Sequence, residues 1–248
     1  LPPSHAWAGE QGAVFIESGL WLRAQWYPRA GETSWLESCN REVLAVRTAA
    51  GFCDVSTLGK IDVQGADAAA FLDRIYANRM STLAVGRMRY GVMLREDGFV
   101  MDDGTAARLA PDRFLVTTTT ANAVNVYQHM HFCHQVLWPN LDVQFVSVTD
   151  QWAQFAVAGP RSRELLQRVL RADCDISNAA FPYMACGDVR LDDGEAARLF
   201  RISFSGELAY EIAVPTRRGD ALVRKLFAAG ADLGVTAYGL EALNVMRI

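Results

Sequence analysis

The sequence predicts an α+β fold in which helices accompany mainly antiparallel sheets. Strand-like segments, for example 60–65 and 152–158, alternate with segments of helical spacing such as 38–50. Two apolar runs flank the turn Glu96-Asp97-Gly98 and predict a β-hairpin over 90–109. Further strands and hairpins follow Pro182, which favours antiparallel pairing over a parallel sheet.

The remaining elements follow from local patterns. Residues 1–35, rich in Trp and Pro, are predicted to form an irregular lead-in that packs on the body. Gly51–Ser56 breaks the helix that precedes it, and Asp67 is placed to cap a helix over 68–76. We predict strands at 113–118, 143–149, 188–191, 197–203 and 209–214, and helices at 121–137, 162–170, 218–229 and 239–248.

Composition limits the class of protein. The chain has 248 residues, 51% of them hydrophobic and 21% charged, which is typical of a globular protein with a sizeable core. A net charge of −4 argues against a nucleic-acid surface, and no apolar run is long enough to span a membrane. The five cysteines are scattered and form no Cys-x-x-Cys pair, which favours reduced thiols and a cytoplasmic location. The first residue is not Met and no signal pattern follows, so we expect a segment of a longer chain.

Two adjacent acids, Asp102 and Asp103, end the second run of the hairpin. Neighbours on a strand point to opposite faces, so only one of the two carboxylates points inward. Either the inward carboxylate is paired or has a functional role, or both carboxylates are exposed to solvent at the end of the strand. Glu211 poses the same choice, because it lies between Tyr210 and Ile212 in an apolar strand.

Other candidate sites are weaker. His129, His131 and His134 lie with Cys133 on one predicted helix, but no remote ligand cluster completes a metal site. We therefore predict no metal and expect solvent-facing histidines. Dinucleotide-binding and phosphate-loop glycine patterns and the Gly-x-Ser-x-Gly elbow are absent from the sequence.

Five motifs in a fixed order carry a family resemblance. They are Val46-Arg-Thr-Ala-Ala-Gly-Phe-Cys-Asp-Val-Ser, Gly98-Phe-Val-Met-Asp-Asp, Val157-Ala-Gly-Pro, Phe204-Ser-Gly-Glu-x-x-Tyr-Glu-Ile and Gly239-Leu-x-x-Leu-x-x-Met-Arg. Together they resemble the folate-dependent aminomethyltransferases, the family of the glycine-cleavage T-protein, from about residue 40 onward. Stretches such as 56–65, 74–78 and 147–153 resemble one branch, the C-terminal half of the α subunits of heterotetrameric sarcosine oxidases.

The resemblance implies a domain organisation. Residues 1–40 correspond to a lead-in from a preceding domain. Residues 41–248 correspond to a folate-binding module of two intertwined lobes around a central channel. A third lobe, a C-terminal β-barrel, is implied beyond the sequence given.

The resemblance also implies roles for individual residues. Glu211 falls at the position of the pterin-binding Glu, and Asp103 falls at that of the catalytic Asp. Tyr90 and Tyr183 match aromatic residues that line the channel, and Phe204 replaces a Tyr of the T-protein.

Two positions near the C-terminus concern the folate tail. Arg247 matches a family Arg that holds charge near the channel. Leu243 stands where the T-protein has an Arg, a natural partner for the glutamate tail, so the tail contacts of the family do not transfer at this position.

The implied activity is capture of a one-carbon unit from sarcosine oxidation as 5,10-methylenetetrahydrofolate. Tetrahydrofolate is the cofactor implied for this segment, whereas FAD, FMN and NAD are implied elsewhere in a complex with β, γ and δ subunits. One alternative is a stand-alone aminomethyltransferase supplied by a lipoyl carrier. Another is a non-catalytic, folate-sensing protein of the same fold.

Overall fold

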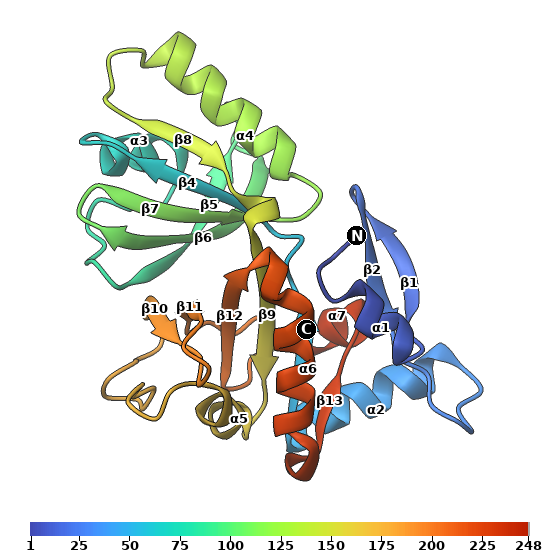
Figure 1. The fold of residues 1–248 in the computed structure, drawn as a ribbon. Helices are drawn as coiled ribbons and strands as arrows, with labels where there is room; N and C mark the ends of the chain where they lie inside the picture. The colour runs from blue at the N-terminus through green and yellow to red at the C-terminus, as the bar shows by residue number, and fades with distance from the viewer. Residues whose placement is uncertain (248) are drawn as a thin grey trace. The chain divides into compact units, whose positions relative to one another are not determined.

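The computed structural model describes residues 1–247 and confirms the α+β class (Figure 1). The chain divides into two compact units. Unit 1 consists of residues 1–56, 151–183 and 187 onward, and unit 2 consists of residues 57–150 and 184–186. None of the helices in this described part of the chain is long and apolar enough to cross a membrane.

Unit 1 is built on a six-stranded sheet with the order β10-β11-β12-β9-β3-β13. Its strands are β3 (Ala50–Asp54), β9 (Trp152–Ala158), β10 (Cys186–Arg190), β11 (Ala196–Phe200), β12 (Ala209–Pro215) and β13 (Val235–Ala237). β12 pairs antiparallel with β9 along its whole length, and β9 pairs antiparallel with β3. β11 also pairs antiparallel with β12, whereas the short β13 runs parallel to its neighbour, β3, so the prediction of mainly antiparallel pairing is confirmed.

Helices cover both faces of this sheet. Apolar side chains of α5 (Ser162–Val169) and α6 (Gly219–Ala229) form the main core with Phe155, Val157, Tyr210 and Ile212. On the other face, α2 (Trp35–Thr48) and α7 (Leu240–Arg247) pack over the opposite set of strand residues, among them Cys53 and Ala158. Short helices η3 (Thr216–Arg218) and η4 (Ala231–Leu233) flank α6 in the sequence.

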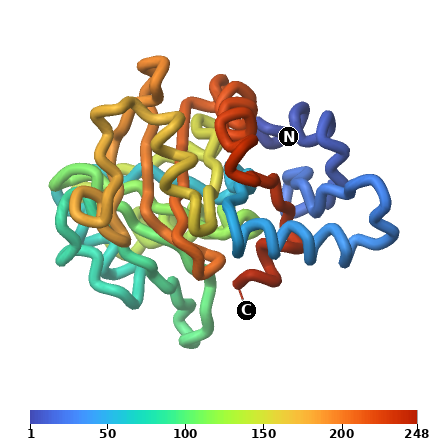
Figure 2. The backbone as a smooth tube through the Cα atoms, turned by 90° about the horizontal axis from the view of Figure 1, so that it is seen from below, coloured from blue at the N-terminus to red at the C-terminus, as the bar shows by residue number. Residues whose placement is uncertain are grey.

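The first 35 residues are more regular than predicted. They form α1 (His5–Glu10) and a hairpin of β1 (Val14–Ser18) and β2 (Trp21–Trp26), so the prediction of irregular structure is wrong. Packing on the body is confirmed, because Trp7 lies in the main core with its ring centroid 5.4 Å from that of Phe52. The tube in Figure 2 shows this N-terminal segment beside α2.

Unit 2 contains a five-stranded antiparallel sheet with the order β5-β6-β7-β4-β8. Its strands are β4 (Gly59–Gln64), β5 (Met88–Leu94), β6 (Val100–Ala110), β7 (Arg113–Thr118) and β8 (Gln144–Ser147). The predicted hairpin is β5–β6, and Gly98 in its turn has a φ of 84°, which favours glycine. The helices of this unit are α3 (Ala68–Ile75), α4 (Ala123–Phe132) and the π-helical η1 (Cys133–Leu137), and the short η2 (Thr149–Gln151) spans its boundary with unit 1 in the sequence.

Two local predictions are corrected. Gly51–Ser56 does more than end a helix, since most of it forms the buried strand β3. Asp67 precedes α3 but does not cap it with its side chain. Instead its carboxylate accepts a hydrogen bond of 2.8 Å from the backbone N–H of Asp142 and so ties α3 to the segment before β8.

Candidate functional site

The two adjacent acids of the hairpin point to opposite faces of the five-stranded sheet, and Asp102 is the inward one. It is 4% exposed and accepts hydrogen bonds from the backbone N–H of Thr119 (3.2 Å), the hydroxyl of Thr119 (2.6 Å) and the amide of Asn122 (3.3 Å). Burial raises the pKa of Asp102, and these bonds partly oppose the rise. Asp102 therefore joins the hairpin to the segment that follows β7.

Asp103 lies on the other face of the sheet and is half-buried. The phenol of Tyr90 donates a hydrogen bond of 2.8 Å to its carboxylate, and this bond raises the pKa of Tyr90. Tyr90 lies on β5, diagonally across from Asp103 on β6, and is 48% exposed. The structure thus brings together two of the residues selected from the sequence.

The strand that carries Asp103 is held close to its neighbour. A Cβ atom on Gly104 would lie 1.9 Å from the carbonyl oxygen of Thr117, so only glycine permits this approach of β6 to β7. The hydroxyls of Thr105 and Thr117 lie 2.8 Å apart on the same face as Asp103. This packing restricts the position of Asp103.

Glu211 lies on β12 in the middle of the six-stranded sheet and is half-buried. Its carboxylate accepts a hydrogen bond from the side-chain amide of Gln154, which is 1% exposed. The amide oxygen of Gln154 has no hydrogen-bond partner among residues 1–247. Glu211 and Gln154 therefore place a carboxylate and an unsatisfied carbonyl oxygen side by side, which suits a ligand with several N–H donors.

The neighbours of Glu211 on this face are three alanines and one phenylalanine. Ala156 lies directly opposite Glu211 on β9, and Ala209 and Ala213 lie two residues away on β12. Phe200 lies directly opposite Glu211 on β11, so the carboxylate has methyl groups on the β9 side and an aromatic side chain on the β11 side.

Phe204 and Arg247 come together at the end of α7. The guanidinium carbon of Arg247 lies 5.6 Å from the ring centroid of Phe204, within cation–π range. Phe204 is 50% exposed. Leu243, one turn earlier, packs against the cluster beneath α2 and α7, so it has a core role here.

Arg47 on α2 holds both segments in place. Its guanidinium donates to the carbonyl oxygen of Ser205 (2.7 Å), the carboxylate of Glu207 (2.7 Å) and the carbonyl oxygen of Met246 (3.0 Å). These acceptors lie next to Phe204 and Arg247 in the chain. Arg47 is therefore a clamp between the loop that carries Phe204 and the end of α7.

Tyr183 lies in the segment before β10 and is 58% exposed. It belongs to unit 1 with Glu211, Phe204 and Arg247, whereas Tyr90 and Asp103 belong to unit 2. That all six residues share one channel stays a prediction.

Sequence reasoning missed Arg47 and Gln154. Gln154 had a signal, because it is the one polar residue within the apolar run Ala153–Ala158. Arg47 had none beyond its place in the Val46–Ser56 motif, since its contacts come from distant parts of the chain.

The histidines of α4 and η1 are half-buried, so the expectation of solvent-facing side chains is wrong. The rings of His131 and His134 lie 4.6 and 6.0 Å from that of Phe145, and His134 bonds the carbonyl oxygen of Leu141 at 3.1 Å. Across residues 1–247, no three His, Cys, Asp or Glu side chains are grouped to hold a metal ion. All five cysteines are free.

Two α+β units, one with an Asp–Tyr pair and the other with a Glu–Gln pair on a central strand, belong to a protein of the aminomethyltransferase fold. Residues 4–248 match the family described as the GCVT N-terminal domain, and the chain belongs to this family. The solved structure of glycine cleavage system aminomethyltransferase T from Bartonella henselae covers 99% of this chain and 61% of its own, with a TM-score of 0.79 at 24% identity.

Curated relatives show which members of the family this chain resembles in sequence. The chain is 57% identical over 99% of its length to the sarcosine oxidase subunit alpha of Rhizobium meliloti (strain 1021), and 48% identical to that of Corynebacterium sp. (strain P-1). It spans about a quarter of the length of these subunits, 25% in each case. An aminomethyltransferase of Bacillus cereus (strain AH820) is 33% identical over 85% of this chain and 55% of its own length.

Proposed function

We propose that this chain is the tetrahydrofolate-binding part of a sarcosine oxidase α subunit. Its role there is to capture the one-carbon unit of the oxidised amine as 5,10-methylenetetrahydrofolate. The observation that carries the proposal is the 57% identity to the Rhizobium meliloti subunit over nearly the whole chain. The identity to the Bacillus cereus aminomethyltransferase supports the transfer chemistry.

Glu211 and Gln154 fit the pterin end of the folate. A pterin presents N–H donors along one edge, and a carboxylate next to an unsatisfied amide oxygen offers matching acceptors. Bonds from N–H donors to a carboxylate are charge-assisted and short. Phe200, directly opposite Glu211 on β11, adds an aromatic side chain to the same face of the sheet.

Asp103 fits the reacting end. When bound, tetrahydrofolate would supply the two nitrogens, N5 in the ring and N10 on its side chain, that bond to the imine carbon, and their two protons pass to the departing glycine nitrogen. A carboxylate beside those nitrogens stabilises the developing positive charge or accepts a proton. The Tyr90 phenol, bonded to Asp103 at 2.8 Å, orients that carboxylate.

Phe204, Tyr183 and Arg247 are proposed to contact the rest of the folate. Phe204 and Tyr183 are half or more exposed and offer ring faces for stacking. Arg247, held next to Phe204, supplies a positive charge for a carboxylate.

The whole-complex assignments stay predictions. They are FAD, FMN and NAD bound elsewhere, assembly with β, γ and δ subunits, the lead-in and two-lobe division at residue 40, and a cytoplasmic location. Purification of the intact complex with cofactor analysis and subunit mass determination tests the cofactors and subunits, limited proteolysis tests the division at residue 40, and cell fractionation tests the location.

The test of the proposed function is a titration of the complete α subunit with 5-formyltetrahydrofolate. Glu211→Gln should weaken binding about 10- to 100-fold, because a charge-assisted bond contributes about 1.5–3 kcal/mol. Glu17→Gln, on the exposed hairpin of β1 and β2, is the matched control and should bind like the wild type. Unchanged affinity in Glu211→Gln would rule out the proposed pterin site at Glu211. Failure of the wild type to bind 5-formyltetrahydrofolate would rule out the proposed folate function.

A further inference from the structure

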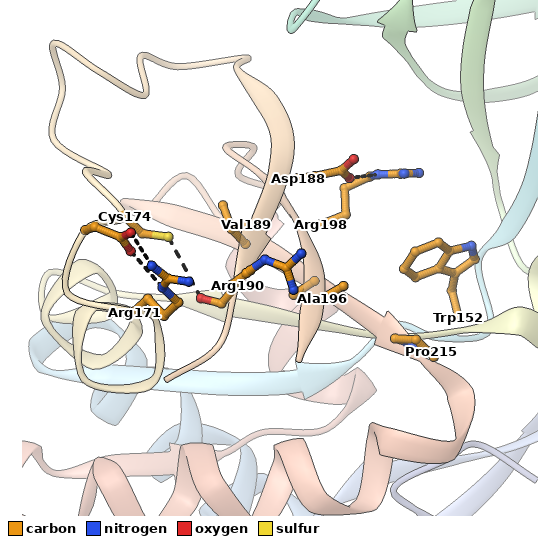
Figure 3. Close-up of a pocket in the computed structure, with 11 residues that line it drawn as sticks. Trp152, Arg171, Cys174, Asp188, Val189, Arg190, Ala196, Arg198 and Pro215 are labelled. Carbon is orange, nitrogen blue, oxygen red and sulfur yellow. Dashed lines mark hydrogen bonds and ion pairs between the residues drawn. The ribbon is translucent and has the colours of Figure 1, made fainter. Parts of the chain in front are cut away.

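Unit 1 contains a cavity of about 550 Å³ at the β10–β11 hairpin, and the proposed folate chemistry does not use it (Figure 3). Its walls come from β9, β10 and β11, the end of β12 and the segment after α5. This volume lies within the range of small-molecule sites.

Two of the three arginines in the cavity are neutralised. Arg198 is 8% exposed, donates a hydrogen bond of 2.8 Å to Asp188, and has its guanidinium carbon 5.0 Å from the ring centroid of Trp152. Arg171 forms a bidentate pair with Asp173, with bonds of 3.0 and 2.5 Å. Both guanidinium groups are fixed by these contacts.

Arg190 is the third arginine, and it has no carboxylate partner within 4.0 Å in the part of the chain that the structure describes. Its guanidinium donates a hydrogen bond of 2.9 Å to the carbonyl oxygen of Gly194 in the β10–β11 turn, and this bond orients the guanidinium group. In Figure 3 it lies between the Arg171 pair on one side and Trp152 with Arg198 on the other. Three guanidinium groups face two carboxylates in this cavity, so one positive charge is in excess.

The rest of the wall is apolar. Val189, Ala196, Ala197 and Pro215 line it together with the ring of Trp152. A ligand that matches one excess positive charge and such a wall is a monoanion with an apolar body. A planar carboxylate suits the guanidinium fork of Arg190, whereas a phosphate dianion carries more charge than the cavity balances.

We propose that this cavity binds the carboxylate of an organic monoanion. Arg190 binds the carboxylate, and the apolar wall formed by Val189, Ala196, Ala197, Pro215 and Trp152 contacts the apolar body. The carboxylate belongs either to a free small molecule or to an acidic side chain of a partner polypeptide, and the experiment separates these two sources.

The first arm is calorimetric titration of the complete α subunit with benzoate, benzamide and inorganic phosphate. Benzoate should bind at least tenfold more tightly than either of the others. Arg190→Gln should lose at least tenfold in benzoate affinity, and Arg190→Lys, which keeps the charge but not the fork, should lose less. Arg217→Gln is the matched control, because Arg217 is 75% exposed and outside the cavity.

Equal binding of benzoate and benzamide would overturn the proposal, and so would phosphate binding as tight as that of benzoate. Equal benzoate affinity in Arg190→Gln and Arg217→Gln would also overturn it. Unchanged binding of 5-formyltetrahydrofolate in Arg190→Gln shows that the variant is folded and that any loss belongs to this cavity.

The second arm repeats the benzoate titration on the assembled complex. If benzoate still binds, the natural ligand is a free carboxylate. If assembly blocks benzoate and Arg190→Gln weakens assembly at least tenfold, the carboxylate comes from a partner polypeptide. If assembly blocks benzoate binding but Arg190→Gln assembles as tightly as the wild type, no partner carboxylate binds Arg190, and the proposal is overturned.

Discussion

Glu42 is a fully buried carboxylate that couples the stability of unit 1 to pH. It lies on α2 and accepts hydrogen bonds from the backbone N–H groups of Tyr27 (2.7 Å) and Gly239 (2.8 Å), so it joins the end of β2 to the start of α7. Burial raises the pKa of Glu42 from 4.5 to about 7, although both N–H bonds act in the opposite direction.

The sign of the effect follows from proton binding. Between pH 4.5 and about 7 the folded protein keeps a proton on Glu42 that the unfolded chain has released. Stability therefore falls as the pH rises through this window. The interval of 2.5 pH units between the two pKa values, at about 1.4 kcal/mol per unit, gives about 3 kcal/mol.

Glu42→Gln removes this titration while keeping the shape of the side chain. The assay is hydrogen exchange in the complete subunit at several pH values, read from peptides that cover β2 and α7. The free energy of opening of the wild type minus that of the variant should fall by about 3 kcal/mol between pH 4.5 and pH 7.5. Glu17→Gln should show no such slope, and a difference for Glu42→Gln that stays within 0.5 kcal/mol across this range would refute the reasoning.

Three further variants test candidate residues in each of the two units. Asp103→Asn should lower the yield of methylenetetrahydrofolate at least tenfold while sparing sarcosine-dependent oxygen consumption, and equal loss of both activities would contradict its role. Asp102→Asn should destabilise unit 2 by about 1–3 kcal/mol in urea unfolding, because its three donors then face an amide. Arg47→Met should weaken 5-formyltetrahydrofolate binding about tenfold and speed exchange at the loop of Phe204, whereas an unchanged exchange rate there would argue against the clamp.

Elements set by local sequence were predictable. The β5–β6 hairpin follows from two apolar runs around a turn that needs Gly98, and β9 follows from an apolar run whose predicted bounds agree with the structure. Strand β3 was missed because four of its five residues are buried, so it shows no alternation of polar and apolar residues. Strand β13 is only three residues long and gains its pairing from β3, far away in the sequence.

Side-chain roles set by distant contacts were not predictable from the sequence. The local pattern at Asp67 predicts a helix cap. In the structure its carboxylate instead accepts a hydrogen bond from the backbone N–H of Asp142. Strand alternation predicts that Asp102 and Asp103 diverge, but only Thr119 and Asn122 show which of them is the buried acceptor. Glu211 was selected from its motif, whereas its partner Gln154 emerges from the pairing of β9 with β12.

The order of segments along the chain imposes an order on folding. Strand β3 pairs with β9 and β13, so Gly51 lies opposite Ala158 and Ala50 lies opposite Val235. All of the five-stranded sheet lies between β3 and β9 in sequence. At synthesis rates of about 5–20 residues per second, β3 waits roughly 5–20 s for its first partner strand, while unit 2 already has every strand of its sheet. The first unit to begin is thus the last to complete its sheet, and its apolar strand Ala50–Asp54 has no partner strand of its own sheet during that interval.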